Sequence, residues 1–260
     1  MNRRRIKNGP VAFFDILGYQ AIIDNNQIET VAQLIVDYID KTPTYLRDFI
    51  KRSFSSLGLS AQELDGLAKL TSRRLLSDSV LLTATQPRAR FNSEDRLWEW
   101  FLFLLECRQL MDWMVKNGLP LKGAIGYGEY FLKRSCFAGK PILDAFRLAD
   151  NLDIAGCAFV PNAWSEVEEA LKKGDEQIAN FIKSISFKYE VPLKVGCSNV
   201  SPFKKDKSES LTMVAFTLPD DWKGNVREKV QKAFTAYNRR IAGKVKTKFE
   251  NTVLMMESFL

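Results

Sequence analysis

The sequence predicts an α/β or α+β sandwich with a one-sided sheet, folded as a single domain. Segments with strand character alternate with segments of helical periodicity along one chain, and no internal repeat or low-complexity stretch interrupts them. The chain has 260 residues, an ordinary length for one domain, and 46% of them are hydrophobic. A sizeable core can therefore form, and we expect one domain over residues 1–260.

The first strand and the first helical region are separated by a glycine. Residues 11–17 (VAFFDIL) are apolar, with β-branched and aromatic side chains, which is typical of a central strand buried on both faces. Gly18 ends this strand. Apolar residues at helical spacing over 30–51 predict one or two helices, divided, if at all, at Pro43. A Ser/Gly-rich stretch and a short amphipathic segment follow at 53–70.

A hairpin, a long helix and a glycine-rich strand are expected next. Residues 75–85 (LLSDSVLLTAT) predict two strands around a tight turn at 77–79. Residues 98–115 predict a very apolar helix, for which core packing is favoured over an interface. The three glycines in the strand at 121–131 indicate that another backbone or a ligand comes close to it.

The second half of the chain continues the alternation. Its expected elements are a short strand or turn at 135–139, a helix from Pro141 to Asn151, a strand at 154–161, helical segments at 164–185 broken at 174–175, paired strands at 187–195 and 211–218, and a basic helical tail at 225–259.

Composition narrows the chemistry. The net charge is +7 with a pI near 9.2, which favours anionic partners such as nucleotides, nucleic acid or a membrane surface. Histidine is absent, which excludes Ser-His-Asp and Cys-His catalysis and His-ligated zinc. General base chemistry must then come from carboxylates, lysine, tyrosine or water.

Cysteine spacing and the N-terminal segment predict a cytoplasmic protein. The four cysteines are far apart and form no CxxC motif, so we expect buried, reduced thiols. The N-terminus is basic, but no long apolar run follows it, so neither a signal peptide nor a membrane span is expected. The cysteines are Cys107, Cys136, Cys157 and Cys197.

Two aspartates interrupt apolar strand segments. Asp15 lies within VAFFDIL and Asp78 within LLSDSVLL. A buried carboxylate without a partner costs several kcal/mol in effective terms, on the order of 20 in the idealised limit. Each aspartate therefore needs a basic side chain, backbone N–H groups or a metal ion. Turn capping would explain Asp78 alone, but the pair, with Gly18 just after Asp15, favours a metal site.

Four motifs over residues 10–162 resemble, in order and spacing, those of the class III nucleotidyl cyclases. The resemblance implies an α+β fold, a ferredoxin-like βαββαβ sandwich with its core at about 10–162 and a C-terminal helical extension at 163–260. The motifs are Phe14-Asp15-Ile16-Leu17-Gly18-Tyr19, Leu76-Ser77-Asp78-Ser79 with Ser77 in place of the usual glycine, the strand LKGAIGYG at 121–128, and Gly139 followed by DAFRLA at 144–149.

The resemblance also implies a two-metal site. Asp15, Asp78 and the backbone carbonyl of Ile16 would bind two divalent cations, Mn²⁺ or Mg²⁺. Cyclisation requires the 3′-hydroxyl of a nucleoside triphosphate to attack its own α-phosphate, with pyrophosphate leaving. Two carboxylates holding two cations suit this reaction, and no histidine is needed.

The family assigns further residues to the substrate. The N–H groups of Leu17, Gly18 and Tyr19 would cradle the β- and γ-phosphates. Arg147 would stabilise charge developing at the α-phosphate. In this family the metal ligands come from one subunit and the arginine from the other, so the resemblance implies a head-to-tail homodimer with shared sites.

Three positions depart from the purine cyclases. Leu143 stands where an asparagine is usual, so the ribose-positioning role falls to Asp144 if any residue takes it over. Arg74 stands at the purine-reading lysine position, and Cys136 at another base-reading position. This pattern resembles the pyrimidine cyclases of bacterial Pycsar anti-phage defence, whose cyclic nucleotide activates a separate effector protein. Because a guanidinium only donates, Arg74 favours UTP, and hence cyclic UMP, over CTP.

Several alternatives stay open. The enzyme could be a cytidylate cyclase making cyclic CMP, an adenylate or guanylate cyclase, or a catalytically inactive nucleotide-binding sensor. A diguanylate cyclase lacks support because the GG[DE]EF turn is missing. The basic run at 223–248 would suit nucleic acid, but a solvated helix explains it better, so we expect neither a nucleic-acid nor a membrane partner.

Overall fold

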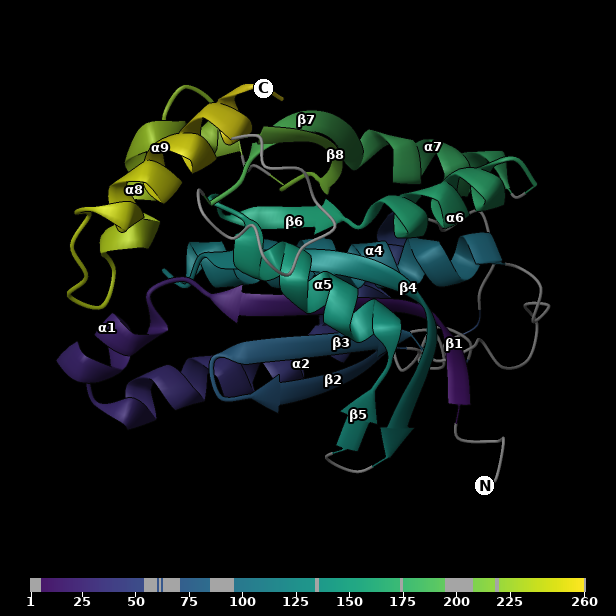
Figure 1. Ribbon diagram of the computed structural model, residues 1–260, viewed down its shortest axis with the longest axis horizontal. Helices are drawn as coiled ribbons and strands as arrows, with labels where there is room; N and C mark the ends of the chain where they lie inside the picture. Colours follow the sequence, from purple (N-terminus) through teal and green to yellow (C-terminus); the bar gives the residue numbers. More distant parts are fainter. Residues whose placement is uncertain are drawn as a thin grey trace.

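The computed structural model describes residues 6–53, 60, 62, 71–84, 96–133, 136–173, 175–194, 208–217 and 220–259 (Figure 1). Its elements follow in chain order. They are β1 (Ile6–Ile16), α1 (Tyr19–Asn25), α2 (Ile28–Ser53), β2 (Thr71–Leu76), β3 (Ser79–Ala84), α4 (Arg96–Lys116), β4 (Leu121–Lys133), β5 (Cys136–Ala138), α5 (Lys140–Asn151), β6 (Gly156–Phe159), α6 (Pro161–Leu171), α7 (Glu176–Ser184), β7 (Ser186–Pro192), β8 (Ser208–Val214), a 3₁₀ turn (Asp220–Trp222), α8 (Val226–Thr235) and α9 (Lys244–Glu257).

The N-terminal half forms a βαββαβ unit. β1 pairs antiparallel with both β3 and β4, and β2 pairs antiparallel with β3, which gives the strand order β2-β3-β1-β4. α2 connects β1 to β2, and α4 connects β3 to β4. This is the ferredoxin-like arrangement, so the predicted α+β fold is confirmed.

The sheet continues beyond this unit. β6 pairs parallel with β4, β8 pairs antiparallel with β6, and β7 forms the far edge, while β5 folds back on β4. The strand pair expected at 187–195 and 211–218 is thereby confirmed as β7 and β8. The expectation of a helical extension at 163–260 needs correction, because these residues also complete the sheet. Their alternating side chains bury Leu211 and Met213 against the core.

The two faces of the sheet are covered differently. α5 crosses β1 and β4 on one face, and α4 lies behind the sheet on the other (Figure 1). α5 can approach closely because Gly126 lacks a side chain: a Cβ there would lie 2.4 Å from the carbonyl oxygen of Pro141. Phe13 of β1 packs edge-to-face on Phe146 of α5, with ring centroids 5.2 Å apart.

α4 is enclosed on all sides. Every residue from Leu97 to Cys107 is buried, between the sheet and the helices α2, α6, α7 and α8. The apolar run at 98–115 is therefore core, as expected. Its one buried acidic residue with an ion-pair partner is Glu106, which binds Arg73 of β2.

The structure decides one open alternative and corrects one expectation. α2 runs unbroken from Ile28 to Ser53, so one helix rather than two forms around Pro43. Cys107 and Cys157 are buried as expected, but Cys136 is exposed, because β5 is a three-residue strand paired with β4. The basic helical tail is confirmed and consists of the two helices α8 and α9.

Some expectations lie outside the described residues. These are Cys197 and most of the segment 53–70. Among the helices that are described, none combines the length and the apolar character needed to cross a bilayer.

Candidate active site

Strand pairing brings the two aspartates together. Asp15 lies opposite Ser79 in the β1–β3 ladder, and the Ile16 N–H donates to the Asp78 carbonyl at 3.0 Å. The Ser79 hydroxyl oxygen lies 3.5 Å from one carboxylate oxygen of Asp15 and 3.5 Å from one of Asp78. The two carboxylates predicted to form a site therefore converge on one hydroxyl.

The hairpin that carries Asp78 has a left-handed residue at its tip. Ser77 has φ 58°, and it is the first of the two residues between β2 and β3. A positive φ at this place is typical of a type II′ turn, which favours glycine. This accounts for the glycine usual in the resembling family, and it shows that serine accepts the same backbone shape here.

The carboxylate pair is electrostatically unfavourable by itself. Burial raises the pKa of Asp15, and the neighbouring charge of Asp78 raises it further, while Lys122 acts in the opposite direction. Two carboxylates that face one another in a half-buried place repel. A divalent cation between them would remove that repulsion.

Lys122, which the sequence analysis missed, is the basic partner of Asp15. It lies opposite Asp15 in the β1–β4 ladder, with Nζ 3.0 Å from Asp15 Oδ2 and 3.4 Å from Asp150 Oδ1. Lys194 also binds Asp150 Oδ1, at 2.9 Å. A signal was available, because Lys122 interrupts an apolar strand just as Asp15 does.

The donor set fits a hard divalent cation. Asp15 Oδ2 is taken by Lys122, but Oδ1 faces Ser79 and Asp78. Because the N–H and C=O of one strand residue point to the same side, the Ile16 carbonyl also points toward the Asp78 turn. Carboxylate and carbonyl oxygens are ligands that Mg²⁺ and Mn²⁺ prefer. Over the described ranges, no cluster of three or more Asp, Glu or Cys side chains is placed to hold a metal ion, so the carboxylates at this place are the two of Asp15 and Asp78.

The turn after β1 provides two of the three amides predicted to bind phosphate. Gly18 has φ 72° and begins α1, where the first N–H groups have no intrahelical acceptor. The Leu17 N–H is already used, since it donates to the Pro120 carbonyl at 2.9 Å. The prediction that the Leu17 N–H binds phosphate is therefore corrected. The N–H groups of Gly18 and Tyr19 remain as candidates.

Neighbouring arginines of β2 point to opposite faces. Arg73 binds Glu106 of α4. Arg74 lies opposite Leu81 of β3, and Leu81 lies opposite Phe13 of β1. Because Asp15 comes two residues after Phe13 on the same strand, Arg74 shares the face of Asp15. Its Nε is buried without a hydrogen-bond partner in the part of the chain that is described. An unsatisfied donor on this face suits an acceptor on a ligand.

The two α5 residues predicted for the site, Asp144 and Arg147, are not bonded to the aspartates. Asp144 binds Lys140 of its own helix, and Arg147 is half-buried on α5. Within the described residues, no hydrogen bond or ion pair joins Arg147 to Asp15 or Asp78. Leu143 and Phe146, on the same helix, are 44% and 46% exposed.

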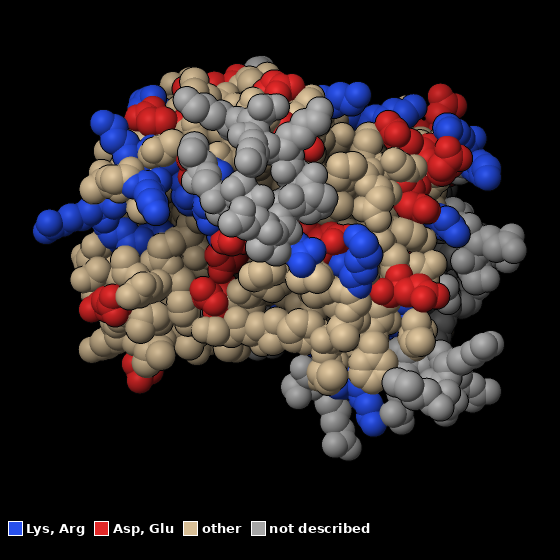
Figure 2. Space-filling model, viewed as in Figure 1, with Lys and Arg blue, Asp and Glu red and all other residues tan. Residues whose placement is uncertain are grey.

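Basic and acidic side chains are distributed unevenly over this face of the molecule. Figure 2 shows basic side chains gathered over α8 and α9, and acidic and basic ones together at the centre, around α5.

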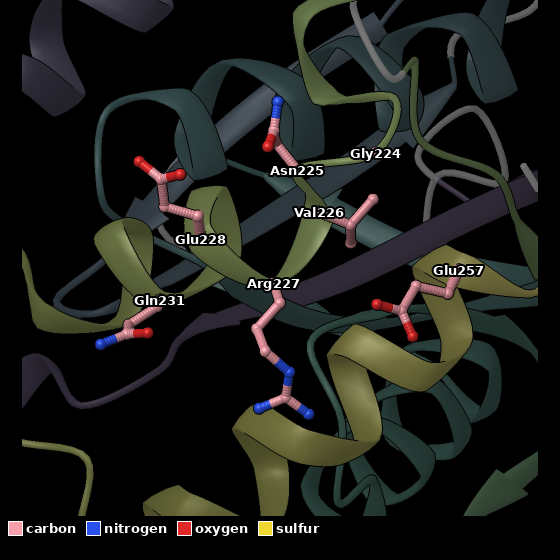
Figure 3. Close-up of a pocket in the computed structure, with 7 residues that line it drawn as sticks. All are labelled: Gly224, Asn225, Val226, Arg227, Glu228, Gln231 and Glu257. Carbon is pink, nitrogen blue, oxygen red and sulfur yellow. The ribbon is translucent and has the colours of Figure 1, made fainter.

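A separate pocket of about 430 Å³ lies between the start of α8 and the end of α9 (Figure 3). None of its lining residues belongs to the predicted site. It is lined by Gly224, Asn225, Val226, Arg227, Glu228, Gln231 and Glu257.

Comparisons with known proteins find likeness in solved structures. No protein-family profile and no curated protein sequence matches the chain. The adenylyl cyclase CyaB from P. aeruginosa is 11% identical with TM-score 0.42, over 83% of this chain and 98% of that one. The guanylate cyclase domain of RhGC from Catenaria anguillulae, in complex with GTP, is 13% identical with TM-score 0.44, over 81% and 97%. The dimeric guanylyl cyclase domain of RhoGC from Blastocladiella emersonii is 12% identical with TM-score 0.38, over 80% and 96%.

Proposed function

We propose that the protein is a metal-dependent nucleotidyl cyclase. The observation that carries the proposal is the convergence of Asp15 and Asp78 on Ser79, with the pKa of Asp15 raised by burial and by its neighbour. Such a pair needs cationic compensation, and the single ammonium of Lys122 binds only one of its four oxygens. Perturbed carboxylates of this kind are typical of functional sites.

The chain's own groups can be assigned to the reaction. Asp15, Asp78 and the Ile16 carbonyl would hold the two cations, Mn²⁺ or Mg²⁺. Bound there, the cations would lower the pKa of the 3′-hydroxyl and neutralise the triphosphate. The amides of Gly18 and Tyr19 would orient the β- and γ-phosphates. The 3′-hydroxyl would release its proton to water as its oxygen bonds to the α-phosphorus, and the bond from that phosphorus to the bridging oxygen would break, so that pyrophosphate leaves.

For the substrate, we propose UTP, converted to 3′,5′-cyclic UMP. Arg74 supports this because it shares the face of Asp15 and has a buried Nε with an unmet donor capacity. The two carbonyl oxygens of uracil accept hydrogen bonds, whereas cytosine has an amino group, a donor, in place of one of them. CTP is the alternative, followed by the purine triphosphates. By the resemblance to anti-phage cyclases, the product would be a second messenger for a separate effector protein.

We further propose a homodimer with shared sites. Because no ion pair joins Arg147 to the aspartates of its own chain within the described residues, it would act on the site of a second copy, with Asp144 as the candidate for positioning the ribose. The exposed Leu143 and Phe146 on the same helix support an interface there, because apolar side chains at that exposure suit burial against a partner.

Substitution of the carboxylates tests the activity. Asp15→Ala and Asp78→Ala should each lower turnover by about a hundredfold or more, since metal ions supply several kcal/mol of transition-state stabilisation. Asp37→Ala is the matched control, because Asp37 is exposed on α2 and binds only Gln33 and Lys41 of its own helix. Full turnover in either site variant, with the protein folded, would overturn the metal assignment.

A further inference from the structure

A buried arginine from the C-terminal segment holds the turn that follows β1. Arg239, in the loop after α8, is 8% exposed. Its Nη1 donates to the Leu17 carbonyl at 2.7 Å. Nη2 donates to the carbonyls of Gly118 and Ala233, and Nε donates to that of Ala236 at 3.0 Å. All four of these acceptors are backbone carbonyls.

This guanidinium joins three parts of the chain that are distant in sequence. Leu17 lies in the β1–α1 turn, Gly118 lies in the α4–β4 turn, and Ala233 and Ala236 lie at the end of α8. The planar fork of an arginine, with donors fixed in direction, can bind several carbonyls at once, which a lysine ammonium does with less geometric control. Burial lowers the pKa of Arg239 to about 10, so the group stays charged at neutral pH.

The segment before Arg239 is also bound to two neighbouring places, the residue after α1 and the residue after α4. Tyr237 and Asn238 both have left-handed backbone, with φ 58° and 59°, which non-glycine residues seldom adopt. The Asn26 side chain donates to the Tyr237 carbonyl at 2.7 Å, and the Tyr237 hydroxyl donates to the Asn117 carbonyl at 2.9 Å. Backbone of this kind persists where the surroundings hold it, and it clusters at functional places.

The arginine also packs directly beneath Gly18. A Cβ at Gly18 would lie 3.3 Å from Arg239 Cδ. The arginine side chain therefore lies against Gly18, the residue whose amide would bind phosphate. The Gly18 amide nitrogen is bonded directly to the Leu17 carbonyl, to which the guanidinium donates. Its contacts fix the turn, and its charge lies beneath the place where a triphosphate would bring negative charge.

We propose that Arg239 is a positioning residue for triphosphate binding, and that the segment 236–239 is for this reason part of the active site's support. The proposal rests on the cyclase function proposed above. Arg239 acts through the backbone of Leu17 and Gly18 and does not itself contact the substrate. Misplacing binding groups by on the order of 1 Å can cost about a hundredfold in rate, so such a support is consequential.

The first test separates binding from chemistry. Arg239→Lys should raise the KM for the triphosphate by about tenfold and lower kcat much less, because the phosphate contacts exist in the ground state as well as in the transition state. Lys248→Met is the matched control. It removes a different basic group of the same C-terminal segment, the partly buried Lys248, which pairs with Asp153 at 2.6 Å and does not bind the turn. The control should lose stability and keep its KM.

A second measurement tests the proposal even if the variant loses stability or the protein has no cyclase activity. Amide hydrogen exchange should be faster at Leu17 and Ile22, whose N–H groups donate to the Pro120 and Gly18 carbonyls, in Arg239→Lys than in Lys248→Met, whether or not the protein turns over a nucleotide. Asn26→Ala is a milder variant that removes the contact with the Tyr237 carbonyl, together with the Asn26 bonds to the Ile22 carbonyl and the Asn238 side chain, and it should raise KM by a smaller factor. A folded Arg239→Lys with wild-type KM, or with unchanged exchange at Leu17 and Ile22, would overturn the proposal. A wild-type protein without turnover would instead count against the cyclase function.

Discussion

Lys122 Nζ lies 3.0 Å from Asp15 Oδ2, so the ammonium binds one side of the carboxylate whose other oxygen faces Ser79 and Asp78. Lys122 itself is almost buried, and its second partner is Asp150. The lysine compensates part of the negative charge at the site. The Asp15 oxygen that faces Asp78 stays available to a cation. We therefore expect the charge of Lys122 and the binding of a metal ion to be energetically coupled.

Replacing Lys122 should reveal this coupling. Lys122→Met should lower the free energy of unfolding without metal by about 2 kcal/mol, because Asp15 loses a charged partner and the repulsion from Asp78 remains. Added Mn²⁺ should then stabilise the variant more than it stabilises the wild type, since the ion relieves more repulsion. The measurement is Tm at pH 7.5 with and without Mn²⁺.

Lys194→Met provides the comparison for that experiment. Lys194 binds Asp150 but not Asp15. It should leave the Mn²⁺-induced gain in Tm at the wild-type value. An equal gain in Lys122→Met and Lys194→Met would contradict the proposed coupling.

Glu99 should make stability depend on pH. This residue of α4 is 9% exposed, its Oε1 has no hydrogen-bond partner among the described residues, and burial raises its pKa from 4.5 to about 7. The folded state favours the protonated acid. Its contribution is fully present below pH 4.5 and is lost as pH rises through 7, by about 3 kcal/mol in total.

Glu99→Gln removes this titration. We expect urea unfolding between pH 5 and 8.5 to show a shallower fall of stability in the variant than in the wild type. Some fall should remain, because burial also raises the pKa of Asp112 to about 6. Parallel pH profiles for the two proteins would mean that Glu99 does not titrate in this range.

Subunit mixing tests the shared site. Asp15→Ala and Arg147→Ala should each be inactive alone, and the mixed dimer should regain activity, because one of its two sites then has both Asp15 and Arg147. Differently tagged subunits allow the heterodimer to be purified before the assay. An inactive, verified heterodimer would count against an arginine supplied by the second copy.

Most of the sheet could be predicted from local patterns. The run at 11–17, the turn at 77–79 and the alternation at 187–195 each have a strong local signal, and the structure contains the corresponding strands. The pattern around Pro43 left one or two helices open, and the structure has a single helix of 26 residues that continues past this proline. Cys136 misled because an apolar neighbourhood in sequence does not reveal that a strand lies at an edge.

Only part of the candidate site could be predicted from the sequence. Asp15 and Asp78 were identifiable because a carboxylate in an apolar strand is costly, and the same logic applied to Lys122 would have found it. Arg239 was not identifiable, because its partners are carbonyls more than a hundred residues away or in its own helix end, and a carbonyl leaves no mark on the sequence. The hydrogen bond of the Leu17 amide could likewise not be predicted, because it depends on which segment lies beside Leu17 in the fold.

The most direct measurement is incubation of the purified protein with ATP, GTP, CTP and UTP separately in the presence of Mn²⁺, with products identified by mass. The account predicts a cyclic monophosphate from UTP, with pyrophosphate released and no product after Asp78→Ala. A cyclic product from a purine triphosphate alone would contradict the role given to Arg74. The absence of any cyclic product, in a protein that still binds the nucleotide, would contradict the central claim.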